Sequence, residues 1–130
     1  MEDLFTRGIV EFNRQYFFEA HDVWEELWME TTGGHRVFYQ GLIQTAVGFY
    51  HLSNENFKGA SSQFGKALAK LEQYLPSFHG INTAKLVDSI RMCLADAERL
   101  RDGAGGTFEA GKIPQIAFCD ERASGNNDFA

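Results

Sequence analysis

Apolar residues recur with the period of an α-helix through almost every segment up to Asp102, and no stretch alternates for long in the manner of a strand. Each apolar stripe must be buried against another helix, because an amphipathic helix cannot cover its own face. The stripes and the breakers between them predict helices over residues 3–12, 17–30, 37–53, 57–74 and from 82 or 83 to 103. The sequence therefore predicts an all-α, compact single-domain bundle of about five helices.

The third predicted helix, residues 37–53, is apolar almost all round and is therefore expected at the centre of the bundle. It contains Gly41 and Gly48, which are seven residues apart and so lie on nearly the same side of the helix. A glycine in a helix interior costs up to about 1 kcal/mol relative to alanine. We expect the compensation to be the close approach of a neighbouring helix at both positions.

The character of the chain changes after Gly103, where glycine and polar residues dominate. We assign residues 1–103 to the helical bundle and residues 104–130 to an extended, glycine-rich C-terminal tail. The segment IPQIAF, residues 113–118, carries the apolar anchors that would dock this tail on the bundle. Beyond these anchors we expect the end of the tail to fray.

The net charge of −6 limits the classes of partner that this chain attracts. An acidic surface offers no electrostatic footprint for the phosphates of nucleic acids, and it is equally unsuited to an anionic membrane surface. The most apolar stretch, residues 37–52, is interrupted by polar residues and is shorter than the roughly 20 apolar residues that a membrane span needs. We therefore expect neither a nucleic-acid partner nor a membrane partner.

Cys93 and Cys119 lie far apart and form no CxxC or metal-ligand pair. The beginning of the chain, MEDLFTRGIVEF, is acidic and amphipathic and lacks the basic start and apolar core of a signal peptide. Both features predict a reduced, cytoplasmic protein in which Cys93 serves as a small core residue.

Residues 12–28, FNRQYFFEAHDVWEELW, crowd two tryptophans, a histidine and several acidic residues into one predicted helix. On a helical wheel His21 and Glu25 follow each other at i, i+4 along the edge of the aromatic face, so their side chains can meet. Asp22 and Glu26 lie toward the opposite side, and Glu19 falls in the first turn. The apolar face itself is formed by Phe17, Ala20, Trp24, Leu27 and Trp28. We interpret Asp22 and Glu26 as a solvated face and His21 with Glu25 as a partly desolvated edge.

A polar stripe interrupts the otherwise apolar third helix. Gln40, Gln44 and His51 fall within about 40° of one another on its wheel. A buried amide or imidazole without a hydrogen bond destabilises a fold by roughly 1–3 kcal/mol, so these groups need partners. The edge formed by His21 and Glu25 supplies them if the second and third helices pack antiparallel.

Two interpretations of these polar residues remain open. In the first, His21, His51 and a carboxylate from Glu25 or Glu19 bind a divalent metal such as zinc, and Gln40 or Gln44 orients a ligand or the bound water. In the second, the same groups form a closed hydrogen-bond network that fixes the register of the helices. The H-x-x-x-E spacing is not the HExxH motif of metalloproteases and does not decide between them.

Two histidines lie outside this cluster, His35 after the Gly33-Gly34 pair and His79 in the loop SFHG. Both fall in predicted loops, and we expect both to be exposed.

The two segments FNRQYFFEAHDVWEELW and YQGLIQTAVGFYHLSNENFKGA together resemble the prokaryotic family called domain of unknown function 309, over about residues 5 to 75. The resemblance implies an all-α bundle and a family described either as uncharacterised or as predicted metal-dependent hydrolases. The polar positions of the family pattern fall on Glu19, His21, Glu25, Gln40, Gln44 and His51 of this chain.

The chain departs from this pattern at two turns. The family pattern has glycine at the positions occupied here by Gln15 and Glu55, so both turns must form without it. A third departure, Asp22 in place of glutamate, is a minor change on the outer face. These departures affect loop geometry and leave the candidate site intact.

Two functions from different classes follow from these observations. The first is a pocket between the second and third helices that binds a metal or a small polar ligand, with hydrolase activity in which His21, His51 and Glu25 hold the metal and Glu19 is the general base. The roles of Glu19 and Glu25 are interchangeable at this level. The alternative is a non-enzymatic interaction or oligomerisation module, favoured by the aromatic content and by a tetratricopeptide-like hairpin over residues 41–71.

Overall fold

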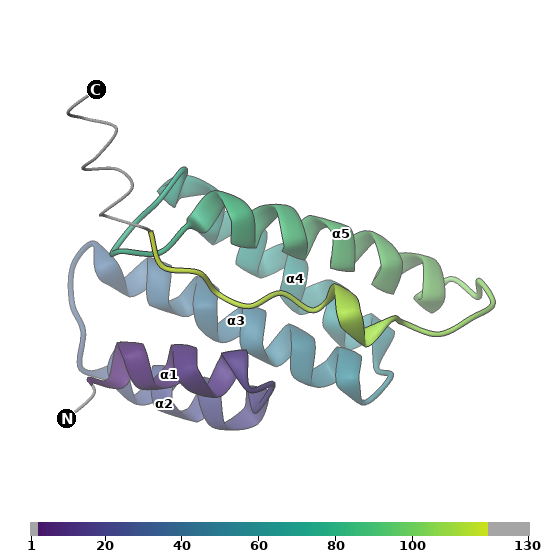
Figure 1. Cartoon of the computed structure of the whole chain (residues 1–130), viewed down its shortest axis with the longest axis horizontal. Coiled ribbons are helices and arrows are strands. Elements are labelled where there is room, and N and C mark those ends of the chain that lie inside the picture. The colour runs from purple at the N-terminus through teal and green to yellow at the C-terminus, as the bar shows by residue number, and fades with distance from the viewer. Residues whose placement is uncertain (1–2, 120–130) are drawn as a thin grey trace.

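The computed structural model describes residues 3–119, and these residues fold into five α-helices with no β-strand among them (Figure 1). The predicted all-α bundle is confirmed. Two single-turn 3₁₀ helices are added, η1 over Glu72–Tyr74 and η2 over Ala110–Lys112. The α-helices are α1 Leu4–Asn13, α2 Phe17–Met29, α3 His35–Ser53, α4 Phe57–Leu71 and α5 Thr83–Arg101.

Each helix packs against the one before it in the chain, and consecutive helices run in opposite directions (Figure 1). The predicted central helix, α3, contacts both α2 and α4. The core is rich in aromatic rings, and Trp24 and Cys93 are fully buried in it. Burial raises the pKa of the Cys93 thiol to about 12, so this cysteine is an unreactive core residue at neutral pH, as the sequence predicted. The largest fully buried rings are those of Trp24, Phe12, Phe38, Phe49 and Phe64.

The two glycines of α3 lie where α4 crosses it. A Cβ atom at Gly41 would lie 2.9 Å from the Leu71 side chain, and one at Gly48 would lie 2.5 Å from the Phe64 ring. Real Cβ atoms do not approach other atoms so closely, and an added methyl group in a packed core forces its neighbours to shift. The predicted close approach of a neighbouring helix is therefore confirmed at both positions.

Side-chain caps set the beginnings of three helices. The carboxylate of Asp3 accepts a hydrogen bond from the Thr6 amide at the start of α1. Asn56 caps α4 through the Gly59 amide in the same way, and Asn82 caps α5. Such caps satisfy amides that have no partner within the helix, each worth about 1 kcal/mol.

The ends of α1 and α3 share one turn geometry, the Schellman motif. The amide of Gln15 bonds to the Phe12 carbonyl, and the amide of Glu55 bonds to the Leu52 carbonyl three residues before it. Both residues adopt left-handed backbone conformations, with φ of 66° at Gln15 and 59° at Glu55. This position favours glycine, because any Cβ is strained there. In α1 the left-handed residue, Gln15, comes two residues after the last helical residue, Asn13.

The C-terminal tail runs back along the bundle from the end of α5 (Figure 1). The Asn13 side chain holds it at Ile116, accepting from the Ile116 amide at 2.7 Å and donating to the Ile116 carbonyl at 3.1 Å. Ile116 is 2% exposed, and Ile81 pairs with Phe118 in an isolated β-bridge. The predicted fraying concerns the end of the tail, residues 120–130, which lies outside the described residues.

Candidate functional site

His21 and Glu25 meet on the exposed side of α2, as their i, i+4 spacing predicts. The His21 Nε2 atom lies 2.9 Å from the Glu25 carboxylate, and its Nδ1 atom lies 3.4 Å from the Asp22 carboxylate. The His21 side chain is 24% exposed, whereas the Glu25 side chain is 51% exposed. The edge predicted from the wheel therefore exists, with a largely covered imidazole and a half-exposed carboxylate.

One end of the groove between α2 and α3 is a hollow of about 180 Å³, here called the apolar hollow. It contains both His21 and His51, so the packing of α2 on α3 brings the two histidines to one surface depression. The ring of Phe18 lies 5.6 Å from that of Tyr50 and 5.8 Å from that of His21, measured between centroids. The lining residues are Phe17, Phe18, His21, Val47, Tyr50 and His51.

The other end of the groove is a hollow of about 160 Å³, here called the polar hollow, lined by Glu25, Trp28, Gln40, Ile43 and Gln44. Two of its polar atoms, Trp28 Nε1 and Gln44 Oε1, are buried and have no hydrogen-bond partner among the described residues. An unpaired buried donor or acceptor costs about 1–3 kcal/mol, so these atoms are unusual in a stable fold. The Arg36 guanidinium lies over the indole ring of Trp28, 3.8 Å from the ring centroid.

The six residues predicted for the site are divided by this groove. His21 and His51 line the apolar hollow, Glu25 and both glutamines line the polar hollow, and Glu19 is exposed and lines neither. The His21–Glu25 contact joins the two hollows. No side-chain hydrogen bond among residues 3–119 links His51 or either glutamine to this pair, so a closed network is not formed there.

Among residues 3–119 the predicted metal ligands are not gathered around one point. The Nδ1 atom of His51 faces the Asn56 side chain at 3.3 Å, and Glu25 belongs to the other hollow. Across the described part of the chain, no three His, Cys, Asp or Glu side chains are grouped as a metal site requires. The tail does not line either hollow within its described residues.

A second cluster of titratable residues, which sequence reasoning missed, lies at the end of the bundle where α1 begins. The Tyr39 hydroxyl lies 3.2 Å from His79 Nε2, and the rings of His35 and His79 are 4.7 Å apart. Both histidines are exposed as predicted, although His35 begins α3 and does not lie in a loop. The contact between the two histidine rings joins residues that are far apart in sequence. The only sequence signal for the cluster was the i, i+4 spacing of His35 and Tyr39.

The electrostatics of this cluster oppose a charge on His79. Burial lowers the pKa of His79 below its ordinary value of 6.5, His35 lowers it further, and Asp3 opposes both. Burial also raises the pKa of Tyr39 above its ordinary value of 10.0, so the phenol stays neutral. The native state therefore favours neutral imidazole at residue 79.

Lowering the pH from about 7.5 to 5.5 is expected to destabilise the protein slightly through His79. Its stabilising contribution is complete above the unfolded pKa near 6.5 and is lost as the pH falls through the lower folded pKa. The effect is small because the residue is exposed. His79→Asn removes the titration and suits the left-handed backbone, φ 51°. Its melting temperature should vary less over this window than that of the wild type, and equal pH slopes in the two proteins would contradict the assignment.

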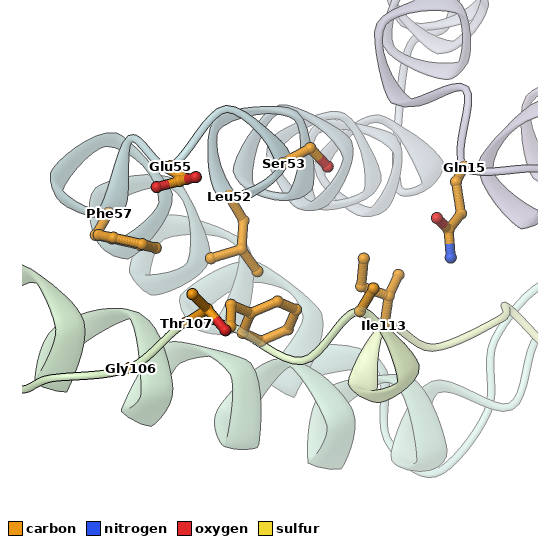
Figure 2. Close-up of a pocket in the computed structure, with 10 residues that line it drawn as sticks. Gln15, Leu52, Ser53, Glu55, Phe57, Gly106, Thr107 and Ile113 are labelled. Carbon is orange, nitrogen blue, oxygen red and sulfur yellow. The ribbon is translucent and has the colours of Figure 1, made fainter.

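A third depression, of about 300 Å³, lies between the tail and the turns that end α1 and α3 (Figure 2). Gln15 lines it from the first turn. The end of α3, the second turn and the start of α4 contribute Leu52, Ser53, Glu55 and Phe57, and the tail contributes residues 106–108, 110 and 113. It contains none of the six site residues predicted from the sequence. The signal that pointed toward it was the pair of non-glycine residues, Gln15 and Glu55, at turn positions.

Comparison with known families gives a match over residues 5–63 to the family described as Domain of unknown function (DUF309). The match covers a little less than half of the chain. The resemblance seen in the sequence is confirmed, although the match ends at residue 63 and not near residue 75. The DUF309 region contains every residue that lines the two hollows of the α2–α3 groove, whereas α5 and the tail lie beyond it. No curated protein matches the chain. None of the described helices is long and apolar enough to span a membrane.

Proposed function

We propose that the α2–α3 groove of this protein binds a small, uncharged organic ligand that carries an amide-like group on an aromatic body. The observation that carries the proposal is the pair of buried, unpaired atoms in the polar hollow, Trp28 Nε1 and Gln44 Oε1. One is a hydrogen-bond donor and the other an acceptor. An amide presents the complementary acceptor and donor in one flat group.

The rest of the groove fits the aromatic body of such a ligand. The apolar hollow adjoins the polar one through the His21–Glu25 contact, and exposes almost only apolar surface. Phe18 and Tyr50 remain 50% and 40% exposed at its rim. A ring packed against them would bury apolar area at about 25 cal/mol per Å². Because both unpaired atoms are covered, binding includes a turn of the partly buried Gln44 side chain toward the ligand.

Benzamide is a suitable first probe, because it joins an aromatic ring to a primary amide. The chain has two tryptophans, and the Trp24 indole already donates to the Phe5 carbonyl at 3.1 Å. In an NMR titration the Trp28 indole N–H signal should therefore move in a saturable way, with a Kd of about 1 mM, while the Trp24 signal stays in place. Shifts of neither indole, or of both equally, would contradict binding in the groove.

Gln44→Met tests the role of the unpaired acceptor, since methionine has the length of glutamine without its amide. We expect the free energy of unfolding to rise by about 1 kcal/mol in urea titrations, because an unpaired buried oxygen is removed. The affinity for benzamide should fall about tenfold. The exposed Gln73→Met is the matched control, since it removes only an exposed hydrogen bond to the Ala69 carbonyl, and it should leave the affinity for benzamide unchanged without raising the free energy of unfolding. A loss of stability in Gln44→Met would instead support a structural hydrogen-bond network.

The metal-dependent hydrolase expected from the sequence is tested on the same protein. It requires Glu25 and His51 to gather on one side of His21, which they do not do here. If this hydrolase hypothesis holds, protein purified without chelators will contain stoichiometric zinc, and His21→Ala and His51→Ala will each lose the metal. That result would replace the proposal of an uncharged organic ligand.

The interaction module is the second candidate function, and the exposed Phe18, Met29 and Tyr50 side chains on α2 and α3 favour it. It predicts self-association that Phe18→Ser abolishes, measured by sedimentation velocity. A protein that stays monomeric at all concentrations and still binds benzamide would exclude the interaction module and support the ligand site.

A further inference from the structure

We propose that the depression beneath the tail is a second ligand site, specific for a small organic ammonium ion with an apolar body. Three segments that are distant in sequence meet there: the turn after α1, the turn after α3, and residues 106–113 of the tail (Figure 2). Its volume of about 300 Å³ is at the lower limit of ligand-binding cavities. It shares no lining residue with the α2–α3 groove, so it stands independently of the function proposed above.

Two side chains are placed in this depression at a conformational cost. Among residues 3–119, three residues other than glycine have positive φ, and two of them, Gln15 and Glu55, line this one depression. Glycine would form both Schellman turns without strain. Strained backbone of this kind collects at ligand sites, where the side chain supplies what glycine cannot. Here the side chains add an amide and a carboxylate to the depression wall.

The charges around the depression select a cation. Glu55 is the one charged residue in its lining, and no Lys, Arg or His side chain lines it within the described part of the chain. The Glu55 carboxylate has no ion-pair partner among residues 3–119. One carboxylate is too few for a protein-bound metal ion, and an anion would be repelled. An organic ammonium group carries the single positive charge that balances the Glu55 carboxylate.

The remaining lining suits an apolar body attached to that ammonium. The rings of Phe57, on α4, and Phe108, on the tail, both line the depression, and Leu52 and Ile113 add aliphatic surface. Aromatic rings also attract cations through their π faces. The site therefore favours an aryl-alkyl amine over ammonium ion itself.

Phenethylamine is the probe, and phenethyl alcohol is its uncharged match. In an NMR titration at neutral pH the amine should shift the backbone amides of residues 52–57 and 106–113 in a saturable way, with a Kd of about 1 mM. The alcohol should bind about fivefold more weakly. No saturable shift with the amine up to about 10 mM, or equal affinities for amine and alcohol, would overturn the proposal.

Variants at the strained positions separate binding from folding. Glu55→Gln should weaken phenethylamine binding about fivefold and leave the affinity of the protein for phenethyl alcohol unchanged. Glu55→Gly and Gln15→Gly should each raise the melting temperature by about 3 °C, because the backbone strain is relieved. Both variants should also bind phenethylamine more weakly than the wild type does. Glu98→Gln, on the exposed side of α5, is the matched control and should leave binding unchanged. Full amine affinity in both glycine variants would overturn the assignment of this site.

Discussion

Gly8→Ala is expected to destabilise the protein by about 2 to 3 kcal/mol, although alanine is the better helix former. A Cβ atom at Gly8 would lie 2.1 Å from Trp24 Nε1. The indole cannot move aside, because Trp24 is 0% exposed and its N–H donates to the Phe5 carbonyl. The added methyl group therefore either breaks this hydrogen bond or separates α1 from α2. Urea unfolding monitored by tryptophan fluorescence measures the change.

Gly65→Ala is the matched control for this prediction. Gly65 lies on α4, and a Cβ atom there would meet nothing within 4 Å. The same substitution should here stabilise the protein by up to about 1 kcal/mol, through the helix propensity of alanine alone. Opposite signs for the two variants would identify the close contact with Trp24 as the cause. Equal effects would show that the α1–α2 contact is not rigid.

Asn13→Ala is expected to cost about 3 kcal/mol and to release the tail from the bundle. It removes the hydrogen-bond partner of both the N–H and the C=O of Ile116, whose side chain is buried in the wild type. Each unpaired group costs about 1–3 kcal/mol if the tail stays docked, so undocking becomes the easier response. Hydrogen exchange at the Ile116 amide should accelerate about a hundredfold, together with a lower midpoint in urea.

Asn54→Ala provides the comparison for the tail. Asn54 is also an asparagine at a helix end, but its side chain donates to the Tyr50 carbonyl in an exposed position. Its loss should cost less than about 1 kcal/mol and leave the exchange of Ile116 unchanged. Unchanged protection of Ile116 in Asn13→Ala would show that apolar contacts alone hold the tail.

The groove illustrates how far local spacing reaches toward a site. The period of the apolar residues placed His21 beside Glu25 and put Gln40 and Gln44 on one stripe, because neighbours on one helix are fixed by helix geometry. It could not show that Glu25 and His51 belong to different hollows. That separation depends on how α2 lies across α3, which is set by the packing of buried rings.

The sequence by itself determined the helices, their order, the central position of α3, and the close approaches at Gly41 and Gly48. These properties follow from apolar periodicity, from capping residues and from the absence of a Cβ, all of which act over a few residues. Only the tertiary structure decided that Asn13 holds the tail, that His79 meets Tyr39, and that Gln15 and Glu55 share one depression. Each of these joins residues from different helices or turns, and such contacts depend on the global packing, which no local pattern encodes.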